Sequence, residues 1–306
     1  MFSNALFVSF SHRHTTAALR SVIELMRRED GHVTAIAVIE PAPTLQRLLT
    51  PREVTEGVEL ALRETLELDL GQCVAKAAGE RSPADVDIEV VTGHVVAMVL
   101  KRIIEDDHDL LVLTGHPDDQ YARAVIKRLQ RKSPCPVWAI RPSRARKRRI
   151  LAAVDTDTEH HGLDHRILAA ARWLALPGSE VHVVTAWELL GESTLRSSPF
   201  VGAGDRAVDE LRERCEADHR RTLHELLGEH HFGDVPLHVH VRNGAAPDVI
   251  VEMVERHHIN QLVMGTIGRS GIPGFVIGNT AERLLSDVPC SEFVVKPPGF
   301  ASPFVV

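Results

Sequence analysis

The sequence predicts a tandem α/β protein made of two doubly wound domains, each with a five-stranded parallel sheet between layers of helices. Its 306 residues exceed one typical domain and suit two domains of about 150 residues. Short apolar runs alternate with segments of helical period, which is the pattern of a parallel sheet buried on both faces. The second half of the chain also repeats the first in the same order, which indicates a duplication.

Each half begins with an apolar run that ends in a polar turn, LFVSFSHR at residues 6–13 and ILAAVDTD at residues 150–157. After a segment of helical period comes a second apolar run, HVTAIAVIE from His32 and EVHVVTAWE from Glu180. These runs predict the first two strands of each domain, separated by a helix. A helix in this position is the usual connection between parallel strands.

Two long segments with a helical pattern follow, residues 51–79 and 204–231, and each predicts the second helix of its domain. The next stretches also correspond, DIEVVTGHVVAMVLKRIIEDDHDLLVLTG from Asp87 and LHVHVRNGAAPDVIVEMVERHHINQLVMGT from Leu237. Each contains two apolar runs on either side of a helical segment. They predict the third strand, the third helix and the fourth strand.

Each half closes with an apolar strand after a Pro-Cys pair, SPCPVWAIRP from Ser133 and VPCSEFVVKP from Val288. The basic segment RPSRARKRR, residues 141–149, joins the halves. We interpret it as a solvated linker, with an anion-binding patch as the alternative. We therefore expect domain 1 at residues 1–143 and domain 2 at residues 148–306.

The composition argues against several classes of protein. A net charge of −7 argues against a surface that coats nucleic acid. Four cysteines without a C-x-x-C pair are too few for a disulfide scaffold and do not fit a zinc ribbon. No apolar stretch approaches the roughly 18 residues of a membrane helix, and the N-terminal apolar run lacks the basic residues of a signal peptide. We expect a cytoplasmic protein with neither nucleic acid nor membrane as a partner.

A glycine-rich loop in the second half is the strongest functional signal. The segment GTIGRSGIPGFVIGNTAERLL, residues 265–285, follows an apolar strand and runs into a helix. Glycines let backbone N–H groups converge on an anion, and the free N–H groups at a helix start attract it further. Asn279 and Glu282 also form a capping-box pattern, so a turn that serves only the cap is the alternative. Five glycines within residues 265–278 exceed the needs of a cap, and we favour a ligand loop.

The first half lacks this loop. Its matching segment, TGHPDDQYARAVIKRLQRKSPCP, is about four residues shorter and retains Gly115 alone. Asp118 and Asp119 stand where a phosphate would lie, and like charges would repel the anion. At the end of the first strand, Ser11 takes the place that Asp155 has in the second half. We therefore expect the ligand site in the second domain only.

With Gly265, Gly268 and Gly278 at G-x2-G-x9-G spacing between a strand and a helix, the second half resembles the ATP-binding members of the universal stress protein family. The resemblance spans nearly the whole chain as two family domains and is greatest to the tandem, UspE-like members. It implies the adenine nucleotide alpha hydrolase-like fold with strand order 3-2-1-4-5. It also implies that strands 136–141 and 291–296 pair within the chain as a pseudo-dimer, and it leaves a further homodimer open.

The resemblance also implies the residues of the site. Asp155 would contact the adenosine, and Ala186 would line the adenine pocket. The ribose and phosphates would meet residues of the loop and of the following helix start: Gly265, Gly268, Arg269, Gly278, Asn279 and Thr280. The ligand would be ATP or another adenine nucleotide, with which Mg²⁺ could bind. Asn279 replaces the Ser or Thr of the ATP-binding pattern, which keeps a different ligand as an alternative.

No motif indicates catalysis. The chain lacks the G-x-x-x-x-G-K-[ST] loop of NTPases and has no lysine or base placed for phosphoryl transfer, so we expect at most very weak ATP hydrolysis. GAGDRA at residues 202–207 matches a dinucleotide fingerprint but lacks the strand before it. Among the 18 histidines, His238 and His240 share one face of a predicted strand and could bind a metal weakly. No histidine set has zinc-site spacing, and we expect no metal site.

Three functions fit these observations. We favour a stress-response protein that binds an adenine nucleotide in its second domain as a sensor or a switch. The first alternative is a binding module for an apolar or lipid-like ligand, suggested by Asn279 and by Phe275, Val276 and Ile277 in the loop. The second alternative is a scaffold without a small ligand, in which the duplicated domains bind a partner protein.

Overall fold

The computed structural model describes residues 1–10, 12–41, 52–79, 86–116, 118–143, 145, 147–156, 161–189, 191–197, 205–266, 279–300 and 302. The chain forms two compact units. Among the described residues, the first unit contains those before Ala145 and those from Ser291 onward, and the second unit contains the rest. None of the helices in these ranges combines the length and apolar character that crossing a membrane requires.

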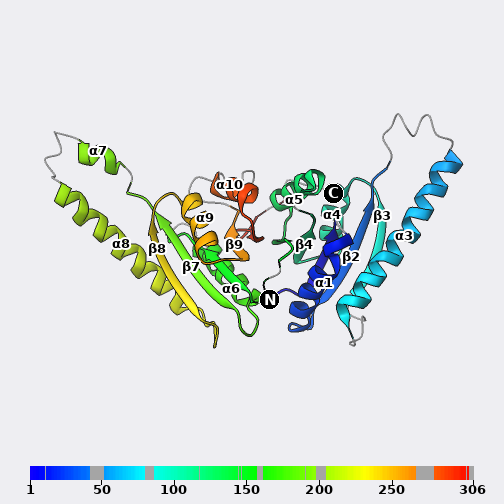
Figure 1. Ribbon diagram of the computed structural model, residues 1–306, viewed down its shortest axis with the longest axis horizontal. Helices are drawn as coiled ribbons and strands as arrows, with labels where there is room; N and C mark the ends of the chain where they lie inside the picture. The colour runs from blue at the N-terminus through cyan, green and yellow to red at the C-terminus, as the bar shows by residue number, and fades with distance from the viewer. Residues whose placement is uncertain are drawn as a thin grey trace. The chain divides into compact units, whose positions relative to one another are not determined.

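The first unit is an alternating α/β structure (Figure 1). In chain order its elements are β1 Asn4–Ser9, α1 His12–Arg27, β2 His32–Ile39, α3 Arg52–Ala78, β3 Val86–Thr92, α4 Val95–Glu105, β4 Leu110–Thr114, α5 Gln120–Lys132, β5 Val137–Ile140 and, far along the chain, β10 Ser291–Val295. The strand order is β3-β2-β1-β4-β5-β10. Strands β1 to β5 are mutually parallel, which confirms the predicted doubly wound order 3-2-1-4-5.

Helices cover both faces of this sheet because its central strands are apolar on both sides. All residues of β4 are buried. In β1, Leu6 and Val8 belong to the core cluster that α4 and α5 complete. The alternate residues Ala5 and Phe7 are equally buried and point to the opposite face, where α1 and α3 pack together. The period of two along a strand thus divides the core between two helical layers.

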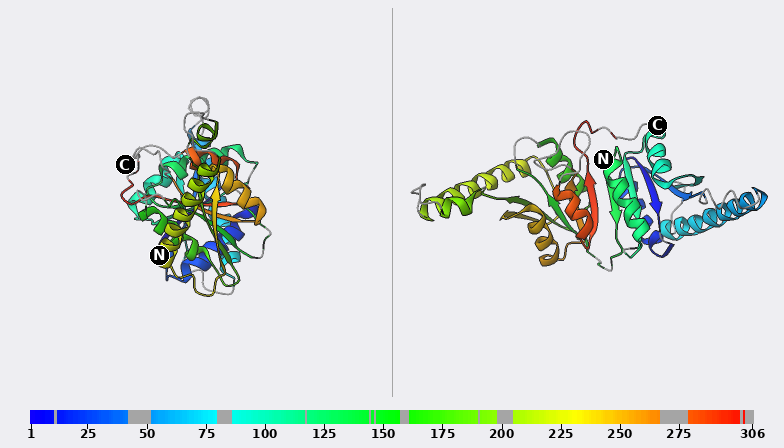
Figure 2. Two further views of the ribbon diagram at one scale, coloured as in Figure 1. Left: turned by 90° about the vertical axis from the view of Figure 1, so that its left-hand side faces the viewer. Right: turned by 90° about the horizontal axis from the view of Figure 1, so that it is seen from above.

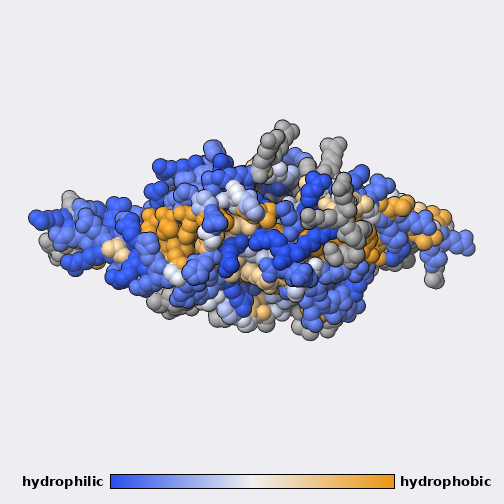
Figure 3. Space-filling view, turned by 90° about the horizontal axis from the view of Figure 1, so that it is seen from below, coloured by the Kyte–Doolittle hydropathy of each residue, from blue (hydrophilic) through white to orange (hydrophobic). Residues whose placement is uncertain are grey.

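Helix α3 contributes only its second half to this core. Leu70 and Val74 are buried near its end, whereas several apolar residues earlier in the helix are exposed: Val54, Val58, Leu60, Leu62 and Leu68. Figure 3 shows hydrophobic surface toward its right-hand end. The first half of α3 therefore extends beyond the sheet that its second half covers.

The second unit repeats the arrangement with one strand fewer. Its elements are β6 Arg149–Ala153, α6 His161–Leu174, β7 Glu180–Trp187, α7 Glu192–Ser197, α8 Asp205–Gly228, β8 Leu237–Asn243, α9 Ala246–Arg256, β9 Gln261–Gly265 and α10 Asn279–Asp287. The strand order β8-β7-β6-β9 is parallel throughout and reproduces the first four places of the predicted order (Figures 1 and 2).

Strand β10 corrects the expectation of two separate five-stranded parallel sheets. It pairs antiparallel with β5, with Phe293 opposite Trp138 and Val294 opposite Val137. The sheet of the first unit is therefore mixed and has six strands among the described residues, and the second unit has four. The physical reason is the apolar edge of β5, which would otherwise expose unpaired backbone groups beside buried side chains.

Aromatic packing supports the ladder between β5 and β10. The ring of Phe293 lies 6.3 Å from that of Trp138 and 5.8 Å from that of Phe2, measured between centroids. Trp138 and Phe293 are both almost fully buried. Aromatic side chains bury more apolar area than other residues, so this trio supplies much of the contact that holds β10 in place.

Buried polar groups fix the position of β10 as well. Gln130 of α5 donates from Nε2 to Glu292 Oε2 at 2.8 Å, and Lys296 donates to the backbone oxygen of Gln130. Burial raises the pKa of Glu292 to about 7 and lowers the pKa of Lys296 to about 7. Burial disfavours the charged form of both side chains, so each depends on its hydrogen bond to α5, and these bonds favour this position of the strand.

Replacing Trp138 by Asp should destabilise the first unit by at least about 3 kcal/mol, because it removes a buried aromatic ring and places a charge in the ladder. Urea denaturation monitored by circular dichroism would measure the loss, and small-angle scattering would report compactness. Leu68→Asp is the matched control, since Leu68 is 67% exposed. Equal stability and compactness of the Trp138→Asp protein and the wild type would contradict a structural role for this ladder.

Candidate functional site

Three predicted site residues lie at the same edge of the second unit. Asp155 follows β6 by two residues, Ala186 is the last but one residue of β7, and Gly265 ends β9. Strand β6 lies between β7 and β9 and is parallel to both. The carboxyl ends of these strands therefore meet, and this edge is where open α/β sheets bind ligands.

The other predicted residues belong to the glycine loop and to the helix after it. Gly268, Arg269 and Gly278 lie outside the described residues. Asn279 and Thr280 are the first two residues of α10, and the structure describes their backbone but not their side chains. The strand ends thus supply one side of the candidate site, and the phosphate-binding role of the loop stays a prediction.

A second carboxylate, Asp164, stabilises the turn that contains Asp155. The backbone N–H of Asp155 donates to Asp164 Oδ1 at 3.0 Å. Asp164 lies in the first turn of α6 and is 1% exposed, and its Oδ2 has no hydrogen-bond partner among the described residues. Burial raises the pKa of Asp164 to about 7, and the neighbouring Asp155 carboxylate adds to the rise. The sequence analysis did not select this residue.

A polar network beside Asp155 was also not predicted. The hydroxyl of Thr156 lies 3.2 Å from that of Thr185 on β7 and 2.7 Å from Nδ1 of His219 on α8. The imidazole of His219 stacks on Trp187 with 5.6 Å between ring centroids. These contacts join two strand ends to α8 and place hydroxyl and imidazole groups, which both donate and accept hydrogen bonds, at the edge that holds Asp155.

Gly265 has a packing role of its own. A Cβ atom at this position would come within 2.6 Å of Cδ2 of Leu163, which is buried in α6. Glycine is therefore needed here for close approach between the end of β9 and the start of α6. This packing requirement does not depend on a bound phosphate. The glycine at position 265 is therefore explained in part by packing and not only by ligand binding.

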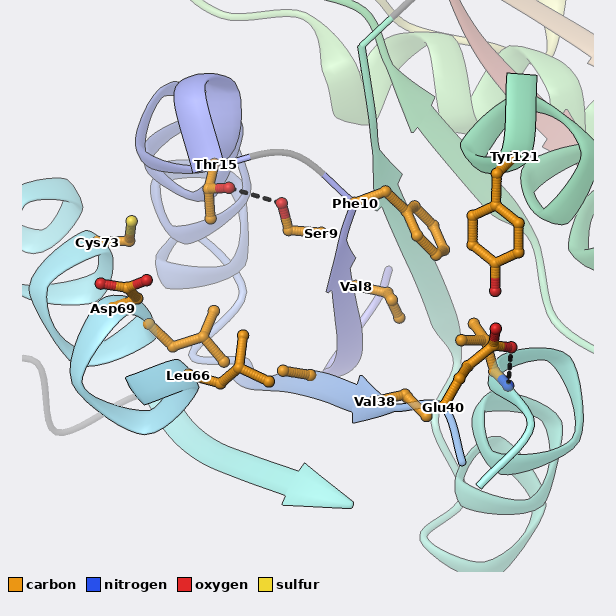
Figure 4. Close-up of a pocket in the computed structure, with 13 residues that line it drawn as sticks. Val8, Ser9, Phe10, Thr15, Val38, Glu40, Leu66, Asp69, Cys73 and Tyr121 are labelled. Atoms are coloured by element: carbon orange, nitrogen blue, oxygen red, sulfur yellow. Dashed lines mark hydrogen bonds between the residues drawn. The ribbon is translucent and has the colours of Figure 1, made fainter. Parts of the chain in front are cut away.

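The first unit has a pocket at the equivalent edge (Figure 4). Its volume is about 280 Å³, and it opens between the ends of β1 and β2, α3 and the start of α5. Most of its lining is apolar, including Val8, Phe10, Val38, Leu66 and Leu70. We expected a ligand site in the second domain only, and this pocket shows that the first unit is also hollowed at the carboxyl ends of its strands.

The polar groups of this pocket are mainly hydroxyls and carboxylates. Glu40 accepts a hydrogen bond from the backbone N–H of Val95 at 3.4 Å, and its carboxylate points toward Tyr121 in Figure 4. Burial, together with the hydrogen bond to Glu40, raises the pKa of Tyr121 to about 12. Asp69 of α3 adds a second carboxylate to the lining. A pocket with two carboxylates repels anions and accepts neutral or cationic groups.

Asp119 explains why the start of α5 offers no place to a phosphate. It is the N-cap of α5, and its side chain accepts a hydrogen bond from the backbone N–H of Ala122 at 3.0 Å. The carboxylate thus occupies the position at the helix N-terminus that an external anion would take. Of the acidic pair Asp118 and Asp119, the second residue therefore serves as a helix cap.

Comparison with known proteins identifies the family of this chain and shows which solved structures share its fold. Residues 1–141 and 147–296 match the sequence model of the Universal stress protein family. Universal stress protein E of Escherichia coli K12 is 26% identical over 317 residues, covering 99% of this chain and 96% of that protein. The protein of the same name from Photorhabdus laumondii is 24% identical over 320 residues, covering 99% and 97%.

Two solved structures share the fold along nearly the whole chain. A functionally unknown protein from Pseudomonas aeruginosa PAO1 aligns with a TM-score of 0.63 at 22% identity, covering 97% of this chain and 93% of that one. A universal stress protein from Archaeoglobus fulgidus aligns with a TM-score of 0.64 at 17% identity, covering 96% and 98%. Both likenesses concern the tandem α/β architecture.

Replacing Asp164 by Asn should change how stability depends on pH. A carboxyl whose pKa is raised on folding stabilises the protein at low pH, and this contribution is lost as the pH rises through about 7. Between pH 5 and pH 8 the wild type should therefore lose about 1–3 kcal/mol more unfolding free energy than Asp164→Asn. Urea denaturation at both pH values measures this difference. Asp234→Asn, at an exposed carboxylate, is the control, and equal losses in wild type and Asp164→Asn would contradict the assignment.

Proposed function

We propose, because the chain belongs to the universal stress protein family, that it is a cytoplasmic stress-response protein whose second domain binds an adenine nucleotide such as ATP or AMP. The protein would act as a sensor or a switch that responds to the bound nucleotide. One observation carries this proposal: Asp155, Ala186 and Gly265 lie at the carboxyl ends of three adjacent parallel strands, and the glycine loop follows directly from Gly265 in the sequence.

The chemistry of this edge suits a nucleoside. A carboxylate at Asp155 would accept hydrogen bonds from ribose hydroxyls or from an exocyclic amine. Asp164 holds the backbone of Asp155 in place through its 3.0 Å hydrogen bond, so the acceptor is positioned before a ligand binds. The loop from Gly265 to Gly278 and the start of α10 would hold the phosphates through backbone N–H groups. Mg²⁺, which prefers oxygen ligands, would bind with the phosphates.

We propose binding without significant catalysis. Members of this family are in general not enzymes. The residues that surround Asp155 in the structure are hydroxyls, a histidine that is engaged with Thr156, and a buried carboxyl group. Phosphoryl transfer also requires a residue that positions or activates the nucleophile, and the sequence offers no lysine or base placed for this role. A steady turnover of ATP above about one per second, low for an enzyme, would contradict this part of the proposal.

We further propose that the ladder between β5 and β10 takes the place of the strand pairing by which single-domain members of the family dimerise. The supporting observation is that β5 and β10 occupy the same place in their respective sequence repeats, each after a Pro-Cys pair.

Gly268→Val should abolish nucleotide binding, because a side chain in the loop would block the approach of phosphate to the backbone. Mass spectrometry of small molecules released by denaturing the purified wild type should find about one adenine nucleotide per chain, and Gly268→Val should retain at most about one tenth of it. Gly57→Val is the control, since a Cβ at Gly57 on α3 meets nothing within 4 Å. Release of no nucleotide, with no heat on titration of ATP into the wild type, would overturn the proposal.

The pocket of the first unit favours a second candidate function. Its apolar lining and its carboxylates at Glu40 and Asp69 suit a small apolar molecule whose polar end is neutral or cationic. This corresponds to the binding module for a non-nucleotide ligand, placed in the first domain rather than the second. A nucleotide in this pocket is disfavoured because its phosphates would meet Glu40, Asp69 and the capping carboxylate of Asp119.

Leu66→Trp should fill part of this pocket and reduce the amount of any apolar ligand that co-purifies with the protein. Leu62→Trp is the matched control, because Leu62 lies one turn earlier on α3 and is 46% exposed. The same mass spectrometric measurement reports the outcome, and circular dichroism checks that both variants fold. Equal ligand content in Leu66→Trp, Leu62→Trp and wild type would show that the ligand binds elsewhere.

A further inference from the structure

Three imidazoles from separate elements converge on one face of the second unit. His182 belongs to β7, His240 to β8, and His257 follows the last residue of α9. Strands β7 and β8 are parallel, with His182 opposite His238 and Val184 opposite His240. His182 and His240 therefore point to the same face of the sheet, which α9 covers. His182 is almost fully buried, and His240 and His257 are half-buried.

The geometry points to a binding site for a zinc-class transition-metal ion formed by His182, His240 and His257. Each offers one ring nitrogen, and these three atoms all lie within 4.8 Å of one another. His182 Nδ1 and His240 Nε2 are 3.1 Å apart. Nitrogens bound to one tetrahedral zinc ion at about 2.0–2.1 Å are about 3.3 Å from each other. The His257 nitrogen lies within 4.8 Å of the other two and would have to move closer, by up to about 1.5 Å, to reach this separation.

The imidazoles have the protonation state that metal binding requires. Burial, with repulsion from neighbouring histidines, lowers the pKa of His182 to about 4, and burial with repulsion from His257 and Arg242 lowers that of His240 to about 4. The pKa of His257 is lowered by burial and by Arg256. Neutral imidazole is the form that ligates. The hydrogen bond between His182 Nδ1 and His240 Nε2 has to be broken, and its proton moved to the other ring nitrogen, for both to bind one ion.

An unsatisfied nitrogen gives an independent indication. His257 Nε2 is buried and has no hydrogen-bond partner among the described residues. A buried polar atom without a partner is uncommon, and a bound cation is one of the groups that satisfies it. The ring contacts of His257 among the described residues are with other imidazoles, with centroids 4.7 Å from His182 and 5.1 Å from His240.

The ligand set indicates the class of metal. Three imidazoles without carboxylate or thiolate suit Zn²⁺, Ni²⁺ or Cu²⁺ and do not suit Mg²⁺ or Ca²⁺. The fourth position would hold water or the exposed His238, whose ring stacks on His182 at 4.6 Å between centroids. The sequence predicted no metal site because no single segment has histidines at zinc-site spacing. The three ligands proposed here come from three separate segments of the chain.

Titration of Zn²⁺ and of Co²⁺ into the whole chain, freed of metal by chelator, tests the site. Calorimetry should find one Zn²⁺ per chain, and Co²⁺ should give the intense visible absorption of a tetrahedral complex. His240→Ala should weaken Zn²⁺ binding at least as much as loss of an outer-shell partner does, about 10–100-fold. His257→Gln, which keeps a polar side chain at a less buried position, should do the same and serves if His240→Ala fails to fold.

Two controls separate this site from other histidines. His224→Ala removes an exposed histidine of α8 and should leave binding unchanged. His230→Ala removes the partner of His165, whose Nδ1 lies 2.8 Å from His230 Nε2, and should also leave binding unchanged. Absence of stoichiometric binding by the wild type, or an equal loss in His230→Ala or His224→Ala, would overturn the inference. Undiminished Zn²⁺ binding by both His240→Ala and His257→Gln would also overturn the inference.

Discussion

Both units depend on one constraint: a parallel sheet that is apolar on both faces must be covered by helices on both sides. The helices return the chain to its starting edge, so the parallel strands of each unit all end at the same edge. Leu6 and Val8 of β1 face α4 and α5, while Ala5 and Phe7 face the opposite layer. Because the core occupies the body of the sheet, polar side chains gather where the strands end. The pocket of the first unit and the Asp155 edge of the second occupy this same position in the fold.

The two copies of this edge have diverged in their polar side chains. In the first unit, Glu40 and Asp69 line the pocket and Asp119 caps α5 with its own carboxylate. In the second unit, the hydroxyls of Thr156 and Thr185 and the imidazole of His219 form a hydrogen-bonded network beside Asp155. Duplication preserved the backbone pattern, because the core demands it, and left the strand ends free to change. The two edges therefore present different polar groups to any ligand that binds there.

The sequence predicted the helices and strands because they depend on local apolar runs and on short connections, whereas the order of the parallel strands came from the resemblance to the family. The pairing of β5 with β10 was expected only from the resemblance to the family, because local apolar runs do not specify an antiparallel contact between segments far apart in the chain. Asp155, Ala186 and Gly265 were expected at the site, and they lie at one edge of the sheet. His219 was missed because it reaches Thr156 from α8, which is far from Thr156 in the sequence. His238 and His240 were recognised on one strand face, whereas His182 and His257 join them only through the packing of β7 and α9.

The membership of β10 in the first unit bears on how the protein is synthesised. Strand β5 leaves the ribosome roughly 150 residues before β10 does, and at typical elongation rates this interval is on the order of ten seconds. During that time the nascent first unit holds Val137 and Trp138 at an edge that has no neighbour. Until β10 is synthesised, the edge of β5 thus has unpaired backbone groups of the kind that favour aggregation.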